Sequence, residues 1–183
     1  MTIPGLLEDS AKKHPHRKAI FAGWKSVSYR SLDVRANRWA QMLRERHGVR
    51  PGDRVALLLK NCPEFIYALF GISKLGAAVV PINNFLKGPE IAYILKDAGV
   101  RTVVTTLDFQ PALAEAKDFL PSVIYLDAPE TSSALAGFPA DAPAVPVDPE
   151  QDAVVIYTSG TTGKPKGAIL THTNICSNAD ASV

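Results

Sequence analysis

The chain has 183 residues, of which 46% are apolar and 21% charged, a composition typical of a domain with a packed core rather than a disordered segment. Its formal net charge of +2 is too small to indicate nucleic-acid binding, and we expect no basic stripe. The longest apolar stretch, residues 65–81, is interrupted by Ser73, Lys74 and glycines, so we expect no membrane span.

The cysteines and histidines give no sign of a metal site. Cys62 and Cys176 lie far apart in no metal-binding or redox spacing, which predicts free thiols in a reducing, cytoplasmic environment. His14 and His16 flank a proline and have lysines around them, which favours a solvated turn over a metal site. The first five residues lack the charged and apolar regions of a signal peptide.

The first half of the chain alternates between helix and strand patterns. Ser28 is a candidate N-cap for a helix with apolar residues at 32, 36, 39, 40 and 43 and with Gly48 just past its end. The apolar run 54–59 predicts a buried strand, after which Asn61 and Pro63 open a helix over 64–75. Residues 78–81 predict the next strand, and both Trp24 and Trp39 are expected to pack against apolar neighbours.

The alternation continues in the second half. We expect a helix from Pro89 to Gly99, a strand over 101–105, a helix over 109–119 and a strand over 123–126. This order predicts an α/β fold with right-handed crossovers and a mainly parallel sheet flanked by helices. The proline-rich segment 128–149 is expected to be a connecting loop without regular structure, and a domain linker is the alternative.

Residues 157–167 form a loop rich in glycine, hydroxyl groups and lysine, directly after the apolar run 153–156. Glycines let a backbone approach an anion, hydroxyl groups donate hydrogen bonds to it, and lysines supply charge. The loop is therefore predicted to hold a polyphosphate, and the candidate ligands are Thr158, Ser159, Gly160, Thr161, Thr162, Gly163, Lys164 and Lys166. An ordinary polar hairpin is the alternative, which this density of suitable groups disfavours.

This loop is not a Walker A motif. Only two residues separate Gly160 from Gly163, and Pro165 follows Lys164 where a Walker A motif requires Ser or Thr. Because proline biases the preceding residue toward extended geometry, we expect the chain to leave the loop as a strand over 167–170, and a helix to begin near Thr173 or Asn174.

Residues 157–167, with 169–172 after them, resemble the signature loop of the adenylate-forming (AMP-binding) enzymes. That family includes acyl-CoA synthetases, aryl-CoA ligases, luciferases and the adenylation domains of peptide synthetases. Ser31 and Thr173 depart from it, since an acidic and a basic residue respectively are more usual there. Upstream segments also resemble the family, namely 28–32, 35–37, 52–56, 61–65 and 76–83.

The resemblance implies ATP-dependent activation of a carboxylic acid, a fatty acid being the first expectation, to an acyl-adenylate and then its thioesterification to coenzyme A. Residues 158–166 would hold the β- and γ-phosphates, while Lys166 would either join them or anchor the loop to a neighbouring acid. The family's magnesium ligand, ribose-binding aspartate and catalytic lysine are expected beyond Val183. The chain is thus expected to be the N-terminal portion of an adenylation domain, without catalytic residues or the C-terminal lid domain and inactive alone.

Other functions remain open at this point. The protein could be an adenylation module that loads a carrier protein, or a nucleotide-binding fragment that catalyses nothing. His172 could face the nucleotide, but packing or capping is favoured. An apolar sheet edge, left without the rest of the domain, could lead the chain to self-associate.

Overall fold

The computed structural model describes residues 1–117, 119, 122–158 and 164–181. Ser28 caps the second helix by accepting a hydrogen bond from the backbone N–H of Ser31, as the sequence predicts. The elements in chain order are α1 (Ile3–Lys13), β1 (Lys18–Ala22), β2 (Lys25–Ser28), α2 (Tyr29–Arg46), β3 (Arg54–Leu58), α3 (Pro63–Lys74), β4 (Ala78–Pro81), α4 (Gly88–Asp97), β5 (Thr102–Thr105), α5 (Gln110–Leu113), β6 (Ser122–Tyr125), α6 (Pro129–Gly137), β7 (Asp152–Thr158), β8 (Lys166–Thr171) and α7 (His172–Asp180).

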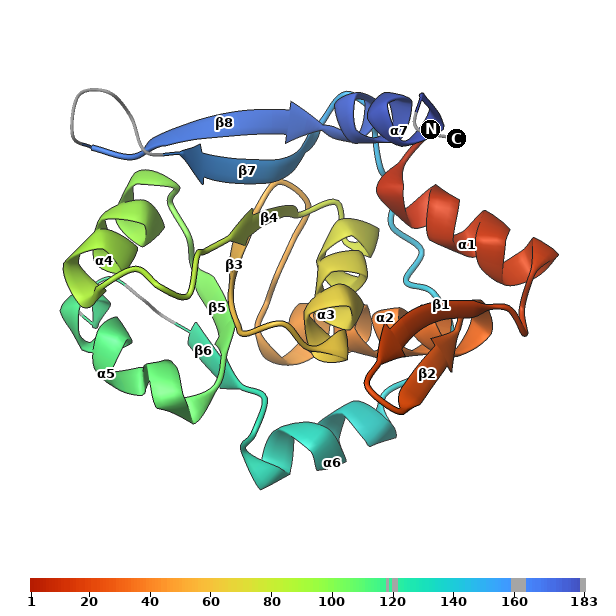
Figure 1. Ribbon diagram of the computed structural model, residues 1–183, viewed down its shortest axis with the longest axis horizontal. Helices are drawn as coiled ribbons and strands as arrows, with labels where there is room; N and C mark the ends of the chain where they lie inside the picture. The colour runs from red at the N-terminus through yellow and green to blue at the C-terminus, as the bar shows by residue number, and fades with distance from the viewer. Residues whose placement is uncertain (118, 120–121, 159–163, 182–183) are drawn as a thin grey trace.

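The main sheet has six strands in the order β6-β5-β3-β4-β7-β8 (Figure 1). The first five run parallel to one another, and β8 returns antiparallel along β7. The predicted α/β fold with a mainly parallel sheet flanked by helices is therefore confirmed. Strands β1 and β2 form a separate antiparallel hairpin.

The central strands β3, β4 and β5 are buried on both faces, which explains why they are largely apolar runs in the sequence, whereas most of β8 is exposed. Alternate residues of β3 contact different helices: Val55 and Leu57 join the core under α2 and α3, whereas Ala56 and Leu58 join the core under α4 and α5. The two cores hold α2 and α3 on one side and α4 and α5 on the other (Figure 1).

Helices α2 and α3 pack closely against each other at Gly71. A Cβ atom added to Gly71 would lie 2.6 Å from Cβ of Trp39 and 3.0 Å from the carbonyl oxygen of Ala36. Trp39 is 2% exposed and lies in the interior under the sheet, so it cannot withdraw without disturbing the core. Only glycine allows this crossing.

Three helices also meet at a buried charge. The ammonium group of Lys74 lies 2.6 Å from a carboxylate oxygen of Glu8 on α1 and 3.0 Å from one of Asp33 on α2. The Lys74 side chain is only 2% exposed, so both carboxylates are needed to offset its loss of hydration. This pairing fixes how α1 sits against α2 and α3.

Several expectations are wrong in detail. The segment 128–149 is not without regular structure, because Pro129 at the helix start and alanines after it form α6. The helix expected over 109–119 is broken into a 3₁₀ turn (Leu107–Phe109), α5 and a second 3₁₀ turn (Ala114–Ala116). Trp39 is buried as predicted, but Trp24 is fully exposed at the tip of the β1–β2 hairpin.

In the described part of the chain, no helix is long and apolar enough to cross a membrane. No disulfide joins Cys62 and Cys176, and Cys176 is buried.

We expect Gly71→Ala to destabilise the protein by about 1–3 kcal/mol, because the new methyl group overpacks the helix crossing. The free energy of unfolding from urea denaturation measures the change. Gly137→Ala is the matched control, since Gly137 also lies in a helix, as the last residue of α6, but has no atom within 4 Å of an added Cβ. Equal effects of the two substitutions would contradict the role of the crossing.

Candidate functional site

The β7–β8 hairpin places the predicted phosphate-binding residues at one end of the sheet. Thr158 pairs with Lys166, and Tyr157 pairs with Gly167, so the two strands hold the loop at their open end. Thr158, Lys164 and Lys166 are exposed there. The other predicted ligands, Ser159, Gly160, Thr161, Thr162 and Gly163, lie outside the described residues. The expected strand after the loop is confirmed as β8.

The loop stands at the carboxyl edge of the parallel strands. Strand β7 is parallel to β4, with Val79 opposite Val154, so Thr158 ends β7 at the same edge where β3, β4, β5 and β6 end. In open α/β sheets, ligands bind at this edge. An ion pair also lies at this edge, since the Lys60 ammonium group is 2.5 Å from a carboxylate oxygen of Asp108.

Helix α4 holds the base of the loop. The Tyr157 hydroxyl donates a hydrogen bond of 2.5 Å to the Asp97 carboxylate, and the Lys164 ammonium group lies 5.9 Å from the centre of the Tyr93 ring. Tyr93 and Asp97 are four residues apart and so share one face of α4. Partial burial, and then the hydrogen bond to Asp97, raise the pKa of Tyr157 above that of an ordinary tyrosine.

Gly167 makes room for the Tyr157 ring. A Cβ atom at Gly167 would lie 3.0 Å from Cζ of Tyr157 and 3.1 Å from Cγ1 of Val155. The glycine that ends the motif therefore lets the ring lie across β8 toward Asp97. The presence of a tyrosine at one end of the segment 157–167 and a glycine at the other is therefore explained by one contact between them.

The two lysines keep their charges available. Among the residues that the structure describes, neither Lys164 nor Lys166 forms an ion pair with an acid. The described acids thus provide no anchor for Lys166. Exposed cations beside a loop of hydroxyl groups and glycines suit an anionic ligand.

His172 is a packing residue, as the sequence analysis favoured. Its side chain is fully buried where α7 meets α1, and Nδ1 accepts a hydrogen bond of 3.3 Å from the backbone N–H of Ile3. Its Nε2 atom is buried without a hydrogen-bond partner in the described structure. Burial lowers the pKa of His172, which favours the neutral ring.

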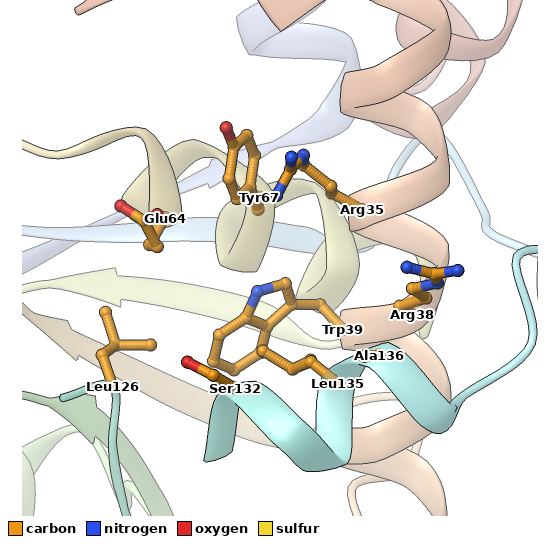
Figure 2. Close-up of a pocket in the computed structure, with 9 residues that line it drawn as sticks. All are labelled: Arg35, Arg38, Trp39, Glu64, Tyr67, Leu126, Ser132, Leu135 and Ala136. Carbon is orange, nitrogen blue, oxygen red and sulfur yellow. The ribbon is translucent and has the colours of Figure 1, made fainter. Parts of the chain in front are cut away.

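A cavity of about 200 Å³ lies elsewhere, between α2, α3 and α6 (Figure 2). The Arg35 guanidinium carbon lies 5.1 Å from the centre of the Tyr67 ring at its wall, and Trp39 and Leu135 contribute apolar surface. The cavity belongs to the α2–α3 side of the sheet, whereas the loop is held by α4 on the other side. Of the predicted phosphate-binding residues that the structure describes, Thr158, Lys164 and Lys166, none lines it.

The described residues contain no cluster of three or more histidine, cysteine or acidic side chains that could hold a metal ion.

A parallel α/β domain with a glycine- and lysine-rich loop at its carboxyl edge defines the class of the protein. Residues 7–183 match the AMP-binding enzyme family, and the chain belongs to it.

Curated relatives include two kinds of protein. The chain is 37% identical over 174 residues, 95% of its length, to phosphinothricin tripeptide synthetase PhsC of Streptomyces viridochromogenes. It is 36% identical over 159 residues, 85% of its length, to the long-chain-fatty-acid–CoA ligase FadD13 of Mycobacterium tuberculosis. It spans only 16% of the first and 31% of the second.

Solved structures share the fold. A fatty acyl CoA synthetase of Mycobacterium tuberculosis superposes over 99% of the chain and 37% of its own length, with a TM-score of 0.89 and 31% identity. The anthranilate CoA ligase AuaEII, solved in complex with anthranoyl-AMP, superposes over 98% of the chain and 36% of its own length, with a TM-score of 0.89 and 29% identity.

Sequence reasoning missed Tyr93 and Asp97. Their positions on a predicted helix do not indicate a contact with the β7–β8 hairpin, because the hydrogen bond between Tyr157 and Asp97 joins residues 60 positions apart in the sequence.

We expect Tyr157→Phe and Asp97→Ala each to destabilise the protein by about 0.5–1 kcal/mol, since the hydrogen bond is partly exposed. The double variant should lose little more than either single variant, because both remove the same bond. Urea denaturation measures the coupling, and Tyr125→Phe is the control because, in the described part of the chain, only the backbone oxygen of Tyr125 accepts a side-chain hydrogen bond. In an absorbance titration, Asp97→Ala should lower the pKa of Tyr157. Fully additive losses would show that the two side chains do not interact.

We expect the free energy of unfolding to fall from about pH 7.5 to about pH 5.5, in part because of His172. Its pKa is lowered in the folded state, so below the ordinary histidine pKa of about 6.5 the unfolded chain binds the proton more readily. The loss from this residue cannot exceed about 1.4 kcal/mol per pH unit.

His172→Asn keeps a hydrogen-bond acceptor for Ile3 and removes the titration. Its unfolding free energy should therefore depend less on pH than that of the wild type. Burial and the neighbouring Arg46 also lower the pKa of His47, so some dependence should persist. An unchanged pH dependence in His172→Asn would refute this assignment.

Proposed function

We propose that the chain is the N-terminal part of an enzyme that uses ATP to activate a carboxylic acid and transfers the acyl group to coenzyme A. A fatty acid is the substrate that we expect. The observation that carries the proposal is that Thr158 and Lys166, which flank the glycine-rich motif, lie at the carboxyl edge of the sheet, and that no described acid forms an ion pair with Lys164 or Lys166. The family supports it, as do relatives named as CoA ligases. The absence of a disulfide between Cys62 and Cys176 is compatible with a cytoplasmic location.

In this proposal, residues 158–166 hold the β- and γ-phosphates of ATP. Thr158, Ser159, Thr161 and Thr162 donate hydroxyl hydrogen bonds, and backbone N–H groups near Gly160 and Gly163 form a nest for the anion. Lys164 and Lys166 supply positive charge. Helix α4 keeps the loop at the sheet edge through Tyr157 and Asp97.

The chemistry is an in-line displacement followed by acyl transfer. A carboxylate oxygen forms a bond to the α-phosphorus as the bond to the bridging oxygen breaks, and pyrophosphate leaves with the electron pair. The sulfur of coenzyme A then attacks the acyl carbon, AMP leaves, and the thiol proton is lost. The loop would stabilise the charge that develops on pyrophosphate. Magnesium, when bound, neutralises phosphate charge, and its protein ligand is expected beyond Val183.

A carrier protein is the alternative acyl acceptor. Relatives such as phosphinothricin tripeptide synthetase match the chain as well as the CoA ligase does. The residues described here concern the first half-reaction, which both kinds of enzyme share. A nucleotide-binding protein without catalysis is the remaining alternative.

Carboxylate-dependent ATP–pyrophosphate exchange by the whole protein tests the first half-reaction. Acids from acetate to long-chain and aryl acids identify the acid class, and adding coenzyme A or a carrier protein then identifies the acceptor. Exchange with a fatty acid, and thioester formation with coenzyme A, are expected. Absence of exchange with every acid would favour the non-catalytic alternative.

We expect Lys166→Ala, and likewise Thr161→Ala, to slow exchange by about 10²–10³-fold while leaving the KM for the acid nearly unchanged. The loss arises because the loop would contact pyrophosphate rather than the acid. Lys96→Ala is the matched control, since Lys96 is also exposed and without an ion pair to a described acid. Exchange equal to that of the wild type would refute the role of the loop.

A further inference from the structure

Two aromatic side chains project from the β1–β2 hairpin into solvent. Trp24 is fully exposed and Phe21 is 78% exposed. Exposed single aromatic residues are common, but two large ones on one short hairpin indicate an interaction surface.

The turn geometry forces this exposure. Ala22 pairs with Lys25, so Gly23 and Trp24 form a two-residue turn, and Gly23 adopts the left-handed φ of +57° that such a turn needs at its first position. Ile20 and Val27 face each other across the hairpin and pack on the core. Phe21 is therefore on the outer face, and Trp24 is at the tip.

An apolar groove continues from Phe21. A cavity of about 440 Å³ lies between β1 and the start of α3, and its walls include Ile20, Phe21, Phe65 and Ile66. The aromatic tip thus adjoins further apolar surface rather than standing alone.

The segment around the hairpin is strongly basic. Residues 11–30 contain six lysines and arginines and no acidic residue, although the whole chain has a net charge of only +2. All six side chains are exposed, and Lys13 alone pairs with a described acid, Asp9 at 3.7 Å. The six residues are Lys12, Lys13, Arg17, Lys18, Lys25 and Arg30.

Backbone contacts gather these charges around the hairpin. The N–H of Arg30 donates to the carbonyl oxygen of Pro15 at 3.2 Å, and that of Tyr29 donates to Arg17 at 3.0 Å. Arg17, Lys18 and Arg30 therefore surround the base of the hairpin, and Lys25 follows the tip. Figure 1 shows this hairpin beside α1, on a different side of the molecule from the β7–β8 hairpin.

We propose that the β1–β2 hairpin docks on the surface of an anionic lipid bilayer, with Trp24 and Phe21 in the interfacial layer and the basic residues against lipid phosphates. Tryptophan is favoured at this depth because its ring is apolar and its N–H is polar. Basic residues near an anionic surface add attraction, about fivefold in affinity for each. Single-stranded nucleic acid is disfavoured, because its bases stack on aromatic side chains along a basic groove rather than at a protruding tip. The proposal does not depend on the reaction that the protein catalyses.

Vesicle co-sedimentation of the protein tests the proposal. We expect association with vesicles of equimolar phosphatidylglycerol and phosphatidylcholine, weakened by salt, and much weaker association with phosphatidylcholine alone. Trp24→Ser should weaken association by about tenfold or more, and Lys25→Ser by about fivefold. Phe85→Ser is the matched control, since Phe85 is 91% exposed outside the hairpin, and it should leave association unchanged.

Fluorescence gives a second measurement, because the chain has only two tryptophans and Trp39 is buried. Lipids brominated in their acyl chains should quench the wild type and leave Trp24→Ser unquenched. Four results would overturn the proposal: no association with anionic vesicles, equal association with neutral ones, an equal loss in Phe85→Ser, or association removed by single-stranded RNA. Dimers that form without lipid and disappear in Trp24→Ser would also overturn it, since a second copy would then occupy the tip.

Discussion

The crossing of α2 and α3 at Gly71 sets the geometry of one whole side of the protein. Because Gly71 has no side chain, the backbone of α3 can lie directly against Cβ of Trp39 on α2, whose side chain is buried. The same approach brings Lys74, at the end of α3, between carboxylates from α1 and α2. A wider crossing would leave that ammonium group with poorer partners in a buried position, which is costly. Packing and electrostatics therefore require the same helix arrangement.

The other side of the sheet is organised around the loop. Strand β7 joins the parallel strands beside β4, and β8 turns back along it, so the glycine- and lysine-rich segment must emerge at the carboxyl edge. Helix α4 then contacts the hairpin twice, through Asp97 and Tyr93. These contacts hold the base of the loop and leave the lysine charges unneutralised by described acids. A polyanion site needs that combination of a fixed base and free cations.

The sequence predicts the parts of the fold that depend on local patterns. Ser28 and Gly48 mark the ends of α2, and the apolar runs mark β3 to β6, because capping and strand burial act within a few residues. Segment 128–149 was misjudged because its prolines suggested a loop, although Pro129 occupies the first turn of α6, where proline is favourable. The Tyr157–Asp97 contact and the Lys74 ion pairs could not be predicted, since they join segments whose distance is set only by the assembled fold.

Trp24 shows a further limit of pattern-based reasoning. An aromatic residue beside apolar neighbours is expected to pack, and Trp39 does so because a helix presents it to the sheet. Trp24 instead occupies a turn whose pairing is fixed by Ala22 and Lys25, and the backbone of a two-residue turn points its side chains away from the core. The turn geometry prevails over the apolar character of the ring. Because the turn geometry keeps this large apolar side chain in water, the folded protein alone cannot gain the free energy of burying it. Burial against a suitable surface nearby would supply that free energy.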